Sequence, residues 1–177
     1  MNELDERAVA TFGDYLGSLA TDAQLLLAEI ADENQNEAVR RILAGALNYL
    51  FKSLDLIDDG IEGLGYLDDA FVLRVACHQA SQSGTLPDPL GALRNDAELV
   101  LDFLGELAGR FQVFVAQLET ISVRGRTAEA IVADGSVRQE LSDDIASWAS
   151  RYKKPHFLLD ERALITLRAF LGAKLPK

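Results

Sequence analysis

The 177-residue chain has little of the two residues that cross-link chains or interrupt helices, with one cysteine and four prolines. A single cysteine, Cys77, cannot form an internal disulfide, which excludes a small disulfide-stabilised scaffold. β-Branched residues are sparse beside Leu and Ala, and this balance favours helices over strands. The composition therefore predicts an all-α bundle of about seven or eight helices, formed as one domain over residues 1–177.

Long apolar runs are also missing. Charged residues interrupt every apolar stretch before it reaches the roughly 20 residues that a membrane-spanning helix needs. The N-terminus lacks a basic segment followed by an apolar run and a small-residue cleavage site. We therefore expect a soluble, cytoplasmic protein with no transmembrane segment.

Positive charge is scarce: the chain has 17 Lys and Arg and 28 Asp and Glu, which gives a net charge of -11. This balance argues against nucleic acid as a partner, because phosphate binding requires a cationic surface. The charge is unevenly placed: residues 151–177 hold seven Lys and Arg against two acids, which leaves about -16 on the rest. We expect this basic tail to dock on the acidic body or on a second subunit. Contact of the tail with an anionic membrane surface is the alternative.

Catalytic motifs are absent as well. His78 and His156 are the only histidines, and neither lies in an HExxH motif or beside a credible nucleophile. Cys77 is adjacent to His78, but neighbouring side chains on a helix diverge by about 100°. No phosphate-binding loop, dinucleotide fingerprint or nucleophile elbow occurs. The sequence therefore predicts no catalytic residue and no organic cofactor.

Apolar residues recur at helical spacing along most of the chain. The pattern predicts a first helix from Leu4 to about Ala20, and Thr21 with Gln24 is typical of a capping box that starts a second helix. A further helix is expected over about residues 37–52. The boundaries between these helices are predicted from local polar residues alone.

The second half of the chain contains the longest apolar stripe, which continues after Pro89 as far as Leu118. It predicts one central helix roughly 40 Å long. Gly105 and Gly109 are its weak points, and a break there would give two shorter helices at an angle.

Three polar signals predict helix starts beyond that stripe. Thr127 is expected to begin a short helix, Ser136 with Gln139 a second one, and Asp160 a last one.

The most unusual element is acidic and rich in glycine. Six carboxylates fall within 15 residues that contain no Lys or Arg. Packed together, they would repel one another unless water, backbone N–H groups or a cation compensates their charge. The six are Asp55, Asp58, Asp59, Glu62, Asp68 and Asp69.

This element, DLIDDGIEGLGYLDD, resembles the signature DLIPDFIPVLGYLDD of the YkvA-like family (domain of unknown function 1232), which comprises small helical bacterial domains of unknown biochemical role. The resemblance extends over about residues 45–78. Asp58 and Glu62 stand where the family usually has prolines, and Gly60 and Gly63 replace an aromatic and an apolar residue. The resemblance therefore implies a divergent, soluble member with a more acidic signature.

Three interpretations of the signature remain open, the third of which is that the acidic cluster binds a basic patch of a partner. In the first, the aspartates cap helices, with Asp55 starting a short turn, Asp68 capping the next helix, and Gly65 supplying a positive φ before Tyr66. In the second, oxygen ligands converge on a divalent cation such as Mg²⁺ or Ca²⁺, although the spacing is not that of an EF-hand. The candidate ligands are Asp55, Asp59, Asp68 and Asp69.

These observations favour an uncharacterised bacterial helical domain that acts as a non-enzymatic interaction or regulatory module. Its partner would be another protein or a second copy of the chain. The alternative is a cation-binding protein or a metal-dependent hydrolase that uses the acidic cluster.

Overall fold

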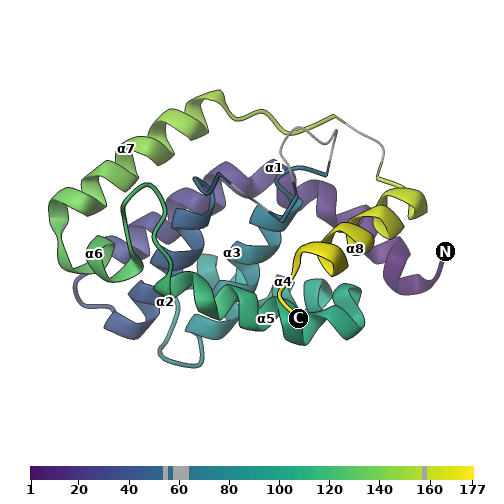
Figure 1. Cartoon of the computed structure of the whole chain (residues 1–177), viewed down its shortest axis with the longest axis horizontal. Helices are drawn as coiled ribbons and strands as arrows, with labels where there is room; N and C mark the ends of the chain where they lie inside the picture. Colours follow the sequence, from purple (N-terminus) through teal and green to yellow (C-terminus); the bar gives the residue numbers. More distant parts are fainter. Residues whose placement is uncertain (54–55, 58–63, 157–158) are drawn as a thin grey trace.

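The structure is a computed structural model that describes residues 1–53, 56–57, 64–156 and 159–177. It is an all-α bundle, as the composition predicts, and no strand occurs among the described residues beyond an isolated bridge between Val123 and Arg126 (Figure 1). The α-helices are α1 (Glu3–Ala31), α2 (Glu37–Tyr49), α3 (Leu67–Ala80), α4 (Asp88–Leu104), α5 (Ala108–Gln117), α6 (Ala128–Ala133), α7 (Gly135–Arg151) and α8 (Glu161–Lys174), with short 3₁₀ helices η1 (Gly105–Leu107) and η2 (Leu118–Thr120).

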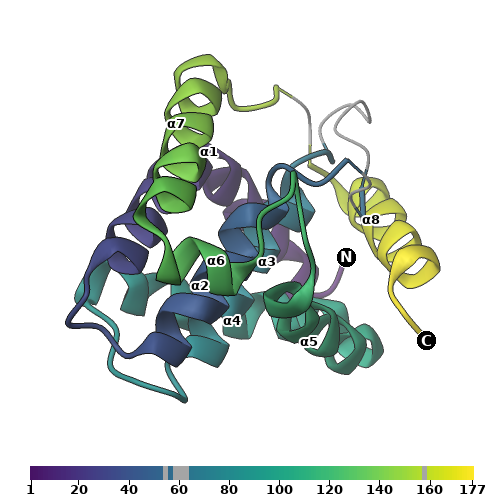
Figure 2. The ribbon, with the colours of Figure 1, turned by 60° about the vertical axis from the view of Figure 1, so that its left-hand side comes forward.

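Helix α3 forms the centre of the bundle. Every residue from Leu67 to Cys77 is buried, which is typical of a helix that is enclosed on all sides. It packs against α1, α2, α4 and α5, and these helices surround it in the rotated view of Figure 2. The core of the protein therefore lies around the helix that follows the acidic signature.

Helix α1 corrects the first predicted break. It continues without interruption from Glu3 to Ala31, so the capping box at Thr21 and Gln24 does not start a new helix. Leu19, Ala23 and Leu26 are all fully buried on one face across that point. Burial of a continuous apolar face thus outweighs a local capping signal.

The apolar stripe after Pro89 does not form one long central helix but two shorter helices, because it is interrupted at Gly105, one of the two predicted weak points. That glycine has φ 54° and ψ -118°, a backbone conformation that L-residues rarely adopt. The chain then makes the 3₁₀ turn η1 and re-enters α5. Of the two weak points in the sequence, the first therefore ends the helix, and the second lies inside α5.

The observed starts of α6, α7 and α8 agree with the starts predicted from the sequence to within two residues. Thr127 caps α6, and Asp160 caps α8 by accepting a hydrogen bond from the N–H of Ala163 at 2.8 Å. Helix α7 begins earlier than expected, because Asp134 accepts the N–H of Ser136 at 2.8 Å. The carboxylate takes the capping role that the sequence suggested for Ser136.

A buried arginine joins three helices at the centre of the bundle. Arg74 of α3 is 2% exposed, and its guanidinium lies 3.2 Å from Asp22 of α1 and 3.3 Å from Asp96 of α4. The guanidinium carbon also lies 3.6 Å from the ring centroid of Tyr15. Ser18 donates a hydrogen bond to Asp22 at 2.7 Å. A buried cation is tolerated when its donors are satisfied in this way.

The basic tail docks on the body of the same chain. Arg168 of α8 forms an ion pair with Asp5 of α1 at 2.6 Å and lies over the ring of Phe103 at 4.1 Å. The N-terminal amine is 3.3 Å from Glu161, so α8 and the N-terminus share one end of the molecule (Figure 1). None of the helices in the described ranges is long and apolar enough to cross a bilayer.

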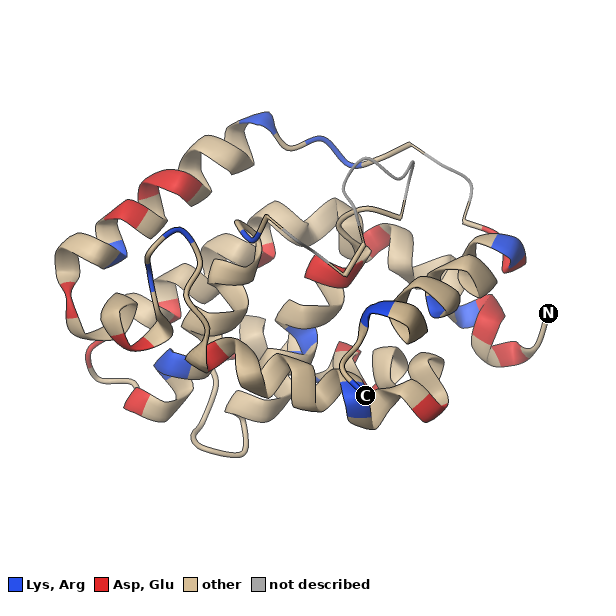
Figure 3. Ribbon diagram, in the orientation of Figure 1, with Lys and Arg blue, Asp and Glu red and all other residues tan. Residues whose placement is uncertain are grey.

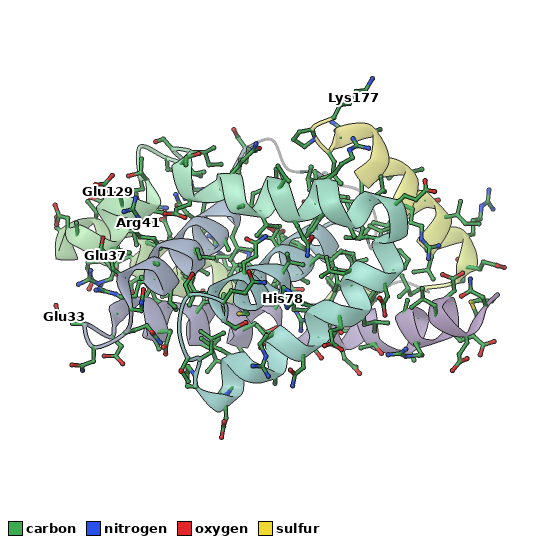
Figure 4. The ribbon with its side chains drawn as sticks, turned by 90° about the horizontal axis from the view of Figure 1, so that it is seen from below. Glu33, Glu37, Arg41, His78, Glu129 and Lys177 are labelled. Atoms are coloured by element: carbon green, nitrogen blue, oxygen red, sulfur yellow. The ribbon has the colours of Figure 1, made fainter. Side chains whose placement is uncertain are left out.

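Helix α2 approaches the chain at η2 very closely. A Cβ atom at Gly45 would lie 2.8 Å from backbone atoms of Leu118 and Glu119. On the outer side of α2, Arg41 bridges Glu119 at 3.1 Å and Glu37 at 3.7 Å, and Figure 4 shows Glu37 and Arg41 projecting together from this helix. The glycine therefore sets the distance at which α2 and η2 pack.

Replacing Gly45 by Ala should destabilise the protein by about 1–3 kcal/mol, because the new methyl group forces two backbones apart. Gly91 in α4 is the matched control, since a Cβ atom added there would have no neighbour within 4 Å. Gly91→Ala should stabilise the protein by roughly 0.5–1 kcal/mol through lower unfolded-state entropy. Urea unfolding measures both changes, and an equal response of the two variants would contradict the close packing at Gly45.

Candidate functional site

The acidic signature is tied to the core by a tyrosine and an aspartate. Tyr49, at the end of α2, donates its hydroxyl proton to Oδ2 of Asp68 at 2.7 Å and accepts the N–H of Leu56 at 2.8 Å. Oδ2 of Asp68 also accepts the N–H of Ile57 at 3.2 Å. These three bonds fix the described part of the connection between α2 and α3.

The environment keeps the tyrosine protonated. Burial raises the pKa of Tyr49 far above its ordinary value, and the negative charges of Asp68 and Asp69 raise it further. The hydroxyl can therefore serve as a hydrogen-bond donor to Asp68 at any physiological pH. Its role in the signature is that of a neutral bridge between the carboxylate and the backbone.

The structure revises the capping interpretation of the signature. Asp68 does not cap α3 but lies inside its first turn, after Leu67, and its carboxylate instead holds the segment at Ile57. The residue before the helix is Tyr66, which has φ 71°. The left-handed conformation therefore falls at Tyr66, one residue beyond the Gly65 indicated by the sequence. For a residue with a side chain this conformation costs about 1–2 kcal/mol.

The proposed metal ligands are only partly within the described residues. Asp55 and Asp59, like Asp58 and Glu62, lie outside them. Asp68 and Asp69 are 0% and 2% exposed in the first turn of α3, where the helix dipole favours negative charge. Within residues 1–53, 56–57, 64–156 and 159–177, no three His, Cys, Asp or Glu side chains are grouped as a metal site. The four-aspartate site remains a prediction.

Thermal melting in EDTA and in Mg²⁺, Ca²⁺ or Mn²⁺ tests the four-aspartate site. A cation at a hundred times its dissociation constant should stabilise the folded chain by about 2.7 kcal/mol. Asp59→Asn should abolish that stabilisation, whereas Asp143→Asn, an exposed position on α7, should preserve it. A melting temperature that is the same with every cation and with EDTA would contradict the site.

The segment from α2 to α3 contains the hydrogen bond between Tyr49 and Asp68 and the left-handed backbone of Tyr66. It is therefore the distinctive part of the chain. Residues 39–74 match the family model of DUF1232, described as a protein of unknown function. This partial match confirms the family resemblance and its place in the chain, consistent with a divergent member. No curated protein and no solved structure gives a significant match.

A groove lies beside the DUF1232 segment, between the end of α2, the hairpin that precedes α6, and α7. Its volume is about 710 Å³, within the usual range of ligand sites. Six of its twelve described lining residues are aromatic or cationic. These are Phe51, Lys52, Tyr66, Arg124, Trp148 and Arg151.

Among the described lining residues of the groove, cations outnumber carboxylates. Asp144 is shared by Arg124 at 3.1 Å and by the buried Arg126 at 2.8 Å. No carboxylate in the described part of the chain forms an ion pair with Lys52 or Arg151. Arg151 instead donates to the backbone and hydroxyl oxygens of Ser147 in its own helix. Figure 3 shows blue segments at the end of α2, on the hairpin and at the end of α7, the last of them set apart from the other two.

Three aromatic rings join the signature to α7. The Tyr66 ring packs edge-on against Tyr152, with centroids 5.2 Å apart, and lies 6.4 Å from Trp148. Trp148 and Tyr152 are 5.0 Å apart, and the Tyr152 hydroxyl donates to the carbonyl of Leu16 at 2.7 Å. The strained residue of the signature thus places its ring in the cluster that supports α7 over α1.

A second hollow of about 490 Å³ adjoins the groove. It is lined by Tyr66, Trp148, Arg151, Tyr152 and Lys153, so the two hollows share three residues. We call the two together the α7 trough. Sequence reasoning did not identify it, because its walls come from segments about a hundred residues apart in the chain. The only usable signal was the run of cations and Tyr152 at residues 151–154.

The remaining chemical candidates do not form a reactive pair. Cys77 is fully buried, and burial raises its pKa to about 12, so the thiol stays protonated. His78 of α3 lines a separate hollow together with Gln79 of α3 and Gln112 of α5. Gln79 donates a hydrogen bond to the carbonyl of Gln112 at 2.8 Å. His156 is exposed in the linker before α8. A cysteine–histidine dyad is therefore not assembled.

Tyr49→Phe should destabilise the protein by about 1–3 kcal/mol, because it removes the acceptor of the buried Leu56 N–H and a donor to Asp68. Tyr152→Phe is the comparison, since it removes the hydrogen bond to the Leu16 carbonyl at a half-buried site, and loss of that bond should cost about 0.5–1.5 kcal/mol. Urea unfolding compares the two. A smaller loss for Tyr49→Phe than for Tyr152→Phe would contradict the bridging role of Tyr49.

Proposed function

We propose that the protein is a non-enzymatic interaction module that binds a partner protein in the α7 trough. The trough carries this proposal, because it combines rings and cations from the DUF1232 segment and from α7 in one concave surface. Aromatic and arginine side chains are the residues that most often anchor partners at interfaces. Their concentration beside the family signature favours recognition as the role of this region.

The chemistry of the described residues supports binding rather than catalysis. Among the lining residues that the structure describes, the only carboxylate of the trough is Asp144, which is paired with two arginines. The trough contains no histidine or cysteine among its described lining residues. Carboxylate, histidine and cysteine side chains are among the usual acids, bases and nucleophiles of enzymes, and they act with a partner that tunes their pKa.

A photo-crosslinker placed in the trough tests the proposal. Ser147 is exposed and lines the groove, so Ser147→Cys accepts a thiol-reactive label there, while the buried Cys77 stays unlabelled because its pKa is raised to about 12. Ser83→Cys, at an exposed position between α3 and α4, is the control. The label at 147 should capture a distinct protein from an extract of the native cells, and the label at 83 should not.

The captured partner must then bind the purified protein and remain chemically unchanged. Mass spectrometry of the partner before and after incubation should give the same mass, as expected for a module without catalytic activity. Identical capture from both label positions, capture from neither, or a modified partner would contradict the proposed function.

A further inference from the structure

From the charge and shape of the α7 trough, we infer that it receives an acidic, extended segment of the partner protein. This inference rests on the proposed function and names the chemistry of the partner. The described cations at the trough are Lys52, Arg124, Arg151 and Lys153. They form a local positive surface on a chain whose net charge is -11.

The charges of the trough are available to a ligand to different degrees. Asp144 already offsets Arg124, whose side chain is 55% exposed, and Arg126, which is 6% exposed. Lys52, Arg151 and Lys153 pair with no carboxylate among the residues that the structure describes. Arginine can bind a carboxylate through two parallel N–H donors. An incoming acidic side chain would therefore compete with no described carboxylate at these three positions.

The shape of the trough favours a chain over a compact molecule. Two hollows of about 710 and 490 Å³ share Tyr66, Trp148 and Arg151 in their walls. A single small molecule would occupy one hollow, whereas an extended peptide can cross both. The cations lie in both hollows, which suits acidic side chains spaced along a peptide.

The aromatic residues supply the apolar contacts between these charges. Tyr66 and Trp148 belong to both hollows, so apolar or aromatic side chains of the peptide would pack against them at the junction. Tyr66 holds its position through a strained backbone, with φ 71°. Strain of this kind is found at functional sites, where it fixes a side chain for binding.

Other kinds of partner fit the trough less well. Nucleic acid would bring a dense negative charge toward an acidic protein. Pairing of a peptide strand with the hairpin is blocked at Val123 and Arg126, because their backbones already bond to each other at 2.9 and 3.0 Å. This favours recognition through side chains, by ion pairs and ring contacts.

Selection from a displayed library of random dodecapeptides tests the inference. Peptides retained by the protein should be enriched in Asp and Glu with interspersed aromatic residues. A selected peptide should change the fluorescence of Trp148, which is the only tryptophan of the chain. Its affinity should fall as salt rises toward ~0.15 M and beyond, because exposed ion pairs are screened.

Charge variants test whether the trough itself is responsible. Lys52→Gln and Arg151→Gln should each weaken binding of the selected peptide about two- to fivefold, as expected for partly exposed ion pairs, and the double variant should weaken it further. Lys174→Gln, at an exposed position on α8, should leave the affinity unchanged. Thermal melting of all variants confirms that each one is folded.

Several results would overturn the inference. Enrichment of basic or uncharged peptides, absence of any enriched peptide, or full affinity in the double variant would each do so. Displacement of the peptide by ATP at equal concentration would assign the trough to small anions instead.

If these experiments fail while the label at position 147 still captures a protein, the partner chemistry is wrong and the proposed function stands. If the capture fails while acidic peptides still bind, the proposed function is wrong and the chemistry of the trough stands.

Discussion

The structure depends on one constraint: its central helix is buried on every side and yet carries charged residues. Asp68, Asp69 and Arg74 of α3 are each at most 2% exposed. A charge removed from water costs several kcal/mol unless hydrogen bonds and opposite charges surround it. The neighbours of α3 must therefore occupy positions that supply these partners. Asp22 and Asp96 do so for Arg74, and they thereby fix α1 and α4 against the central helix.

The same constraint shapes the family signature at the other end of α3. Asp68 draws the Tyr49 hydroxyl and the N–H of Ile57 to one carboxylate oxygen, so the end of α2 and the chain beyond it are held against the start of α3. The chain must then turn sharply into the helix, and it does so through the left-handed backbone of Tyr66. That turn directs the Tyr66 ring toward Trp148 and Tyr152. A buried carboxylate is thus linked, residue by residue, to the wall of the α7 trough.

Sequence patterns were informative where one physical signal dominated. The helix over about residues 37–52, the caps at Thr127 and Asp160, and the DUF1232 signature follow from periodicity, side-chain oxygens and local spacing. The predictions failed where two signals competed. At Thr21 a capping pattern lost to the continuous apolar face of α1, and at Gly105 a continuous stripe was broken by a glycine with positive φ. The spacing pointed to Gly65, whereas the left-handed residue is Tyr66, and local spacing carries no information on the packing of the Tyr66 ring against Trp148 and Tyr152.

The basic residues of the C-terminal tail lie at two different places in the folded chain. Arg168 of the basic tail is neutralised by Asp5, so α8 docks on the acidic N-terminal helix. Arg151 and Lys153, at the start of the same tail, lie instead at the trough. Lys154 reaches back over α1, since Cβ atoms added at positions 13 and 17 would lie within 3.8 Å of its side chain. One basic segment therefore has two roles: its later part holds the bundle together, and its first part places positive charge beside the DUF1232 segment. A substitution that reverses charge in α8 should disturb the fold, whereas one at the start of the tail should change recognition, so the two roles are separable along the sequence.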